Sequence, residues 1–134
     1  MKNLQQACTK PVDRKRTVLL ADDETGIRAL LTVMLQKNGF RVLVARDGEE
    51  AVDIFKANPR EIGTVLLDVQ MPRRTGPDAA KIIRGIQPDV RIVLSSGMLK
   101  SELMRQFPME APWTFLEKPF SYTSVSSVFP QSAQ

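Results

Sequence analysis

Residues 64–68 read TVLLD, and this short segment decides how the rest of the chain is interpreted. An uninterrupted run of apolar and β-branched residues after Gly63 is typical of a strand that is buried on both faces, as in the centre of a parallel sheet. The segment ends in the carboxylate of Asp68. Because open α/β sheets bind their ligands beyond the carboxyl ends of their strands, Asp68 is the first candidate functional residue.

The pattern of the other apolar residues predicts four more strands with helices between them. Residues 17–21 (TVLLA) repeat the opening pattern and are followed by Asp22 and Asp23. The further strands are predicted at residues 40–45, 91–95 and 113–117, and the helices at residues 26–38, 48–58, 76–87, 102–107 and, weakly, 121–129. Strand and helix thus alternate five times, which predicts an α/β fold with right-handed crossovers and a doubly wound parallel sheet.

Length and charge predict a single domain with short tails. A chain of 134 residues with 43% hydrophobic residues can bury one core. We expect a disordered basic leader at residues 1–16, the domain at residues 17–129 and a tail at residues 130–134. The leader holds five of the 19 basic and one of the 15 acidic residues, so the rest of the chain is neutral. A basic leader without aromatic residues is more typical of a solvated tail than of a nucleic-acid arm.

The composition excludes several classes of site. The chain has no histidine, which excludes the usual zinc sites, Ser-His and Cys-His nucleophile pairs, and a phosphorylated histidine. The single Cys8 cannot form an internal disulfide bond, which suits a reducing compartment. No apolar run approaches the roughly 20 residues that span a bilayer, and the first residues do not resemble a secretion signal. We therefore expect a cytoplasmic protein that does not associate with membranes.

Polar residues at the ends of the predicted strands suggest a metal site. If the strands before Asp22 and Asp68 are neighbours in the sheet, their ends lie about 5 Å apart, and three carboxylates including Asp23 share one crevice. Such a cluster is unfavourable without a cation, and hard oxygen ligands with several waters suit Mg²⁺. Ser96 and Lys118 would lie at the ends of the next two strands. An acid nucleophile, a metal, a hydroxyl and an ammonium together provide what phosphoryl transfer requires.

Four motifs in order carry a resemblance to a known family. They are residues 18–24 (VLLADDE), 66–72 (LLDVQMP), 95–97 (SSG) and 115–120 (FLEKPF). Taken together they closely resemble the receiver domain of two-component response regulators, over about residues 17–129. Strand order does not follow from spacing alone. The resemblance implies a flavodoxin-like five-stranded parallel sheet of order 2-1-3-4-5 with five helices.

The resemblance also implies a role for each acid. Asp68 matches the aspartate that accepts a phosphoryl group from a phosphohistidine donor. Asp23 matches the direct Mg²⁺ ligand, and Asp22 the acid that holds the ion through water. Gln70 matches the residue whose backbone carbonyl completes the metal shell.

The remaining site residues are assigned in the same way. Ser96 matches the switch hydroxyl that turns toward the phosphoryl oxygens, with Ser95 as the alternative. Lys118 matches the lysine that binds the phosphoryl group, and its bond to Pro119 is expected to be cis, which is uncommon for such bonds. Phe115 matches the aromatic residue that swings inward when the hydroxyl moves.

The resemblance implies a signalling protein and not a classical enzyme. The domain is expected to catalyse only its own phosphorylation and dephosphorylation and then to change its affinity for a partner. The expected donor is a sensor histidine kinase or a histidine phosphotransfer protein, and the expected target is a downstream protein. A phosphorylation-dependent dimer stays open. Only 16 residues follow Lys118, so we expect no direct DNA binding, and the chain is either a stand-alone receiver or a piece of a larger protein such as a hybrid kinase.

Alternative interpretations stay open at this point. The serine-rich last helix, together with Arg73 and Arg74 in the loop after Met71-Pro72, suggests a pseudo-receiver that binds partners without phosphorylation. A phosphatase with an aspartate nucleophile is disfavoured, because such enzymes place a second acid two residues after the first, where this chain has Gln70. Asp22 and Asp23 could instead only cap the following helix, and an aromatic residue in a strand is most often part of the core.

Overall fold

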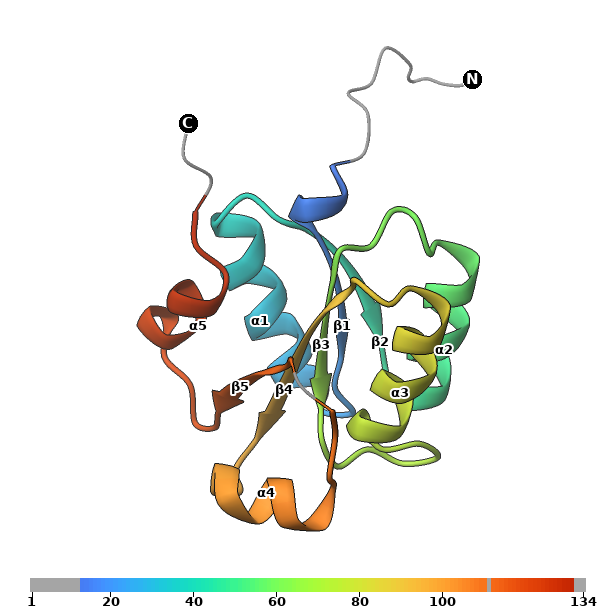
Figure 1. Cartoon of the computed structure of the whole chain (residues 1–134). Helices are drawn as coiled ribbons and strands as arrows, with labels where there is room; N and C mark the ends of the chain where they lie inside the picture. The colour runs from blue at the N-terminus through green and yellow to red at the C-terminus, as the bar shows by residue number, and fades with distance from the viewer. Residues whose placement is uncertain (1–12, 111, 132–134) are drawn as a thin grey trace.

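The computed structural model describes residues 13–110 and 112–131, which form a parallel five-stranded sheet flanked by helices (Figure 1). Along the chain the elements are a short 3-10 turn at Arg14–Arg16, β1 (Thr17–Ala21), α1 (Thr25–Lys37), β2 (Arg41–Ala45), α2 (Gly48–Ala57), β3 (Thr64–Asp68), α3 (Gly76–Ile86), β4 (Arg91–Ser96), α4 (Lys100–Gln106), β5 (Thr114–Glu117) and α5 (Tyr122–Val128). The predicted elements are all present, with bounds that differ by one or two residues. Among the helices that the structure describes, none has the length and apolar character needed to cross a bilayer.

The strand order is β2-β1-β3-β4-β5, as predicted, and each neighbouring pair is parallel. Every residue of β1 and β3 is buried, because these strands lie inside the sheet and are covered on both faces. β2 lies at an edge and exposes Arg41 and Val44. Pairing of Ala21 with Leu67 and of Asp68 with Ser95 aligns the carboxyl ends of the three central strands, so the residues that follow these ends lie close together.

Two hydrophobic clusters cover the faces of the sheet. Figure 1 shows α1 and α5 on one side of the sheet and α2 and α3 on the other. The cluster under α1 and α5 includes Leu35 and Phe129, and the cluster under α2 and α3 includes Phe55 and Ile83. All four side chains are fully or almost fully buried. The two helical layers and the sheet between them give the doubly wound architecture that the alternation of elements predicts.

Tertiary contacts hold the last helix, α5, in place although its serines and β-branched residues are weak helix formers. Ser121 and Ser124 form a reciprocal capping box at its start. At its end, the buried Asn38 side chain donates hydrogen bonds to the Phe129 carbonyl at 2.8 Å and to Ser126 Oγ at 3.0 Å. Tyr122 also donates a hydrogen bond to Asn38 Oδ1.

The last residues of the predicted leader are ordered, so the ordered part of the chain begins earlier than we expected. Residues 1–12 of the predicted disordered segment lie outside the described residues, but residues 14–16 form a capped turn. Arg14 forms an ion pair with Asp89 at 3.0 Å, and the Arg16 guanidinium lies 3.8 Å from the centre of the Phe40 ring. The prediction of disorder up to residue 16 is therefore wrong for this turn, because partners distant in the sequence bind its cationic side chains.

The loop after β3 packs closely against the end of that strand at Gly76. A Cβ atom at this position would lie 2.4 Å from the Asp68 carbonyl oxygen, which is backbone and cannot move aside. We expect Gly76→Ala to lower the free energy of unfolding by about 1–3 kcal/mol, measured by denaturant titration. The control is Gly85→Ala in the same helix, where a Cβ meets nothing within 4 Å, so the helix gains up to about 1 kcal/mol. Equal effects of the two substitutions would contradict the close approach.

Candidate functional site

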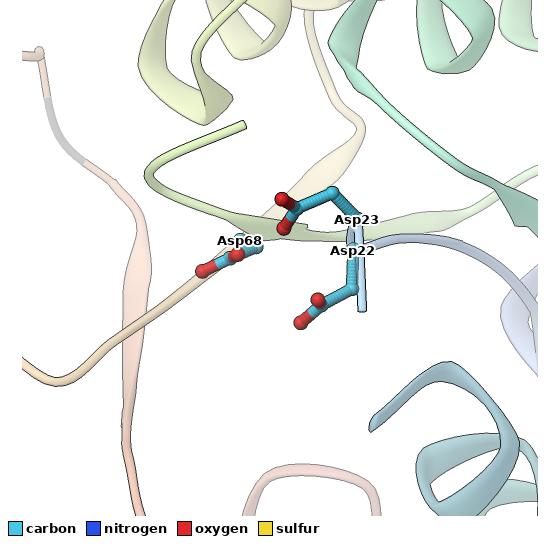
Figure 2. A group of neighbouring side chains, drawn as sticks. All are labelled: Asp22, Asp23 and Asp68. Atoms are coloured by element: carbon cyan, nitrogen blue, oxygen red, sulfur yellow. The ribbon is translucent and has the colours of Figure 1, made fainter. Parts of the chain in front are cut away.

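Three aspartates from two neighbouring strands gather at the carboxyl end of the sheet. Asp22 and Asp23 follow β1, and Asp68 is the last residue of β3. Each offers a carboxylate oxygen within 4.8 Å of the others, and Figure 2 shows the three side chains projecting to the same side of the strand ends. Asp22 and Asp68 are buried, whereas Asp23 is exposed. The structure thus brings together the three acids that the sequence predicts to converge.

Lys118 completes this cluster from the far side of β4. Its Nζ lies 3.2 Å from Asp22 Oδ2 and 3.2 Å from Asp68 Oδ1. Its backbone amide donates a 2.8 Å hydrogen bond to the Ser96 carbonyl, which fixes the end of β5 against the end of β4. The Lys118–Pro119 bond is cis, as the resemblance implies. Among the described residues, one ammonium group therefore contacts two of the three carboxylates, and the cluster keeps an excess of negative charge.

Local hydrogen bonds orient the first acid. Asp22 Oδ1 accepts a hydrogen bond from the Glu24 amide at 2.9 Å, and the Asp22 carbonyl accepts one from the Arg28 guanidinium at 2.8 Å. Sequence reasoning missed Arg28. A cation in the first turn of a helix is unfavourable with the helix dipole, and this was the available signal that Arg28 binds something specific. The N-cap of α1 is Glu24, without a side-chain cap bond, so helix capping does not account for Asp22 and Asp23.

Burial and mutual repulsion shift the pKa of the central carboxylate. Removal from water, followed by the charge of Asp22, raises the pKa of Asp68 to about 6, although the ammonium of Lys118 opposes the shift. Burial lowers the pKa of Lys118, but the carboxylates of Asp68 and Asp22 outweigh it and hold that pKa above its usual value. Ionised Asp68 is therefore held in an unfavourable environment that an added cation would relieve.

The donor set of the cluster fits a partly hydrated Mg²⁺ ion. Mg²⁺ takes oxygen ligands at about 2.1 Å in an octahedron, which places those ligands about 3–4 Å apart. Oxygens within 4.8 Å of one another meet this requirement if one carboxylate binds through a water molecule. Asp22, Asp23 and Asp68 are the residues that could hold the ion, and their hard oxygens favour Mg²⁺ over softer metals.

Three other predicted site residues, Ser96, Gln70 and Phe115, form no hydrogen bond or ion pair with the three acids in the described part of the chain. Ser96 is buried at the end of β4, and its Oγ accepts a hydrogen bond from the Met98 amide at 2.9 Å, so the hydroxyl is tied to its own loop. Gln70 lies in the exposed loop after β3. Phe115 is half-buried and packs against the core under α2 and α3. The roles of these three residues stay predictions.

We expect removal of the Asp68 charge to stabilise the metal-free protein above pH 6. Because the folded-state pKa of about 6 lies above the unfolded value, the folded state binds the proton more tightly, and stability falls as the pH rises from about 4 to 6. Above that range ionised Asp68 costs about 2–3 kcal/mol of stability. Asp68→Asn should therefore unfold at higher denaturant concentration than the wild type at pH 7.5 in EDTA, with a difference that shrinks toward pH 4.

The matched control for this prediction is Asp53→Asn, which removes an exposed carboxylate on α2. Its free energy of unfolding should follow that of the wild type across the whole pH range. A destabilised Asp68→Asn protein at pH 7.5 would show that Lys118 already compensates the buried charge.

Comparison with known sequences identifies relatives of this chain. Residues 18–128 match the family described as the response regulator receiver domain. The sensor kinase CckA of Brucella abortus is 34% identical over 111 residues, which is 83% of this chain and 12% of the kinase. The transcriptional regulatory protein CpxR of Escherichia coli is 37% identical over 105 residues, 78% of this chain and 43% of the regulator. The chain therefore spans less than half of either relative.

A solved structure agrees with the sequence comparison. This chain is similar to a chain in the CheX-CheY-BeF3-Mg²⁺ complex of Borrelia burgdorferi, with a TM-score of 0.74 and 30% sequence identity. The match covers 86% of this chain and 90% of the other.

Proposed function

This chain belongs to the response regulator receiver family, and from that premise we propose that Asp68 accepts a phosphoryl group from a phosphohistidine donor in a Mg²⁺-dependent reaction. The observation that carries the proposal is the position of Lys118 Nζ, 3.2 Å from both Asp22 and Asp68 beside the three-acid cluster. The receiver domain of two-component systems is a signalling domain. We infer that phosphorylation changes its affinity for a downstream protein.

The proposed chemistry assigns each side chain a step. Asp68 is ionised above its pKa of about 6, and a carboxylate oxygen attacks phosphorus while the P–N bond of the donor breaks. Bound Mg²⁺, held by Asp22, Asp23, Asp68 and the Gln70 carbonyl, would supply positive charge for the phosphoryl oxygens. Lys118 exchanges its contact with Asp68 for one with a phosphoryl oxygen, which stabilises the charge that develops there.

We propose that the switch depends on Ser96. For its hydroxyl to reach a phosphoryl oxygen, Ser96 must give up the hydrogen bond from the Met98 amide. A new bond to a charged oxygen is stronger than the bond that is lost, so phosphorylation favours the change. Movement of Phe115 toward the space left by Ser96 would carry the change to the surface of β5.

The proposed donor is a sensor histidine kinase or a histidine phosphotransfer protein. Receivers similar to this one occur in sensor kinases and in a transcriptional regulatory protein. We therefore propose the same kind of phosphoryl donor for this chain, and a protein as its downstream target.

Incubation with acetyl phosphate tests the proposal. With Mg²⁺ present, intact-protein mass spectrometry should show the addition of one phosphoryl group, and EDTA should prevent it. Mg²⁺ alone should raise the melting temperature, because it binds the folded cluster and not the unfolded chain. No phosphoryl addition together with an unchanged melting temperature in Mg²⁺ would favour the pseudo-receiver, a protein-interaction module that works without phosphorylation.

A further inference from the structure

The loop between β3 and α3 contains a strained turn at Arg73. The Arg74 amide donates a 2.7 Å hydrogen bond to the Pro72 carbonyl, and Arg73 between them has a φ of 68°. This is a three-residue turn with positive φ at its centre, a rare and strained geometry that L-residues other than glycine seldom adopt. Such a conformation persists where surrounding contacts hold it, so the side chain of Arg73 is expected to have a firm partner.

That partner is the first turn of α2. Arg73 Nη2 and Nε lie 2.6 and 3.0 Å from Asp47 Oδ2, and Arg74 Nη2 lies 3.0 Å from Glu49 Oε1. Asp47 also caps α2, because its Oδ1 accepts a 2.8 Å hydrogen bond from the Glu50 amide. Burial raises the pKa of Asp47, but the bonds from the Glu50 amide and Arg73 outweigh it and hold the pKa below its usual value.

Backbone packing at two glycines closes the loop at both ends. The Arg74 carbonyl oxygen lies 2.2 Å from where a Cβ of Gly48 would be, so the tip of the loop rests on the start of α2. At the base, Gly76 packs against the Asp68 carbonyl, and its amide donates a 2.9 Å hydrogen bond to the Val69 carbonyl. Gln70 lies within this closed loop, three residues before Arg73.

We propose that the pairs Arg73–Asp47 and Arg74–Glu49 form a clamp that positions the loop carrying Gln70 and thereby sets the Mg²⁺ affinity of the acid cluster. This inference rests on the proposed function, which assigns the Gln70 carbonyl to the metal. Arg73 and Arg74 are positioning residues and not ligands. A loop that is already held in place presents its carbonyl to the ion without a loss of conformational entropy on binding. Outer partners of metal ligands generally raise metal affinity in this way, by orienting the ligands.

The clamp and simple electrostatics predict opposite changes in Mg²⁺ affinity when Arg73 is removed. Removing a cation near a metal site should strengthen Mg²⁺ binding if only charge matters. Removing Arg73 should weaken Mg²⁺ binding if its contact with Asp47 orders the loop. The sign of the change in Kd therefore separates the two explanations.

Isothermal titration of metal-free protein with MgCl2 tests the clamp in three variants. Arg73→Gly removes the side chain and also relieves the positive φ, so the fold is not put at risk. Asp47→Ser breaks the pair with Arg73 but keeps a residue that caps helices well. The control Arg46→Ala removes the same charge as Arg73→Gly from the exposed Arg46–Glu50 pair, whose side chains form no hydrogen bond or ion pair with residues 70–75.

We expect Arg73→Gly and Asp47→Ser to weaken the Mg²⁺ Kd by about tenfold, and Arg46→Ala to leave it unchanged. Amide hydrogen exchange at residues 70–75 of the metal-free protein should be faster in the first two variants and unchanged in the control. A wild-type Kd in Arg73→Gly, or a tighter one, would overturn the clamp alone, even if that variant melts at a lower temperature. If the wild type does not bind Mg²⁺, the proposed function fails and the clamp with it.

Discussion

Replacing Asp68 with asparagine is expected to abolish phosphoryl incorporation from acetyl phosphate. The amide has nearly the shape of the carboxylate, but its oxygen is a far weaker nucleophile and cannot form the acyl phosphate. Because Asp68 is buried beside Asp22 and Lys118, the substitution removes a charge without opening a cavity. The protein should stay folded, and intact-protein mass spectrometry should show no added phosphoryl group at any time point.

Asp53→Asn serves as the control here too, because it removes a surface carboxylate on α2 and should be phosphorylated like the wild type. The modified residue is then identified in the wild type by peptide mapping at low pH. Phosphoryl addition to Asp68→Asn at the wild-type rate would mean that another residue is the acceptor, and the proposed function would have to be abandoned.

Lys118→Gln is expected to slow phosphorylation by about 10²–10³-fold, the usual cost of losing one strong donor to a developing negative charge. Lys118 is the ammonium whose Nζ the structure places 3.2 Å from Asp68. The glutamine side chain is one bond shorter than that of lysine and can donate a hydrogen bond, but it brings no positive charge. The rate is measured from the time course of phosphoryl incorporation at fixed Mg²⁺ and acetyl phosphate concentrations.

Metal binding distinguishes the proposed role of Lys118 from a general loss of the site. Removing the ammonium leaves Asp22, Asp23 and Asp68 without their counter-ion, so the Mg²⁺ Kd of Lys118→Gln should be equal to or tighter than that of the wild type. The surface variant Lys81→Gln, on α3, controls for the loss of one positive charge. A normal phosphorylation rate in Lys118→Gln would rule out a role for Lys118 in charge stabilisation.

Much of the fold could be predicted from local patterns in the sequence. The runs 17–21 and 64–67 consist of apolar and β-branched residues, and the structure buries every residue of both. The acids at the ends of these runs point to the site, because alternating strands and helices can bury such runs only in a parallel sheet whose strand ends lie at one edge. Strand order was not determined by spacing and came from resemblance.

The sequence by itself determined which segments form strands and where Asp22, Asp23 and Asp68 follow them, because apolar periodicity and chain breaks are local properties. Only the tertiary structure decided what those residues contact. The hydrogen bond from Arg28 to the Asp22 carbonyl depends on the direction of the arginine side chain. The hydrogen bond from Asn38 to the end of α5 joins residues that are distant in the sequence. A linear pattern shows which face a residue lies on, but not which partner lies opposite that face. Partners are set by how helices and loops pack across the sheet.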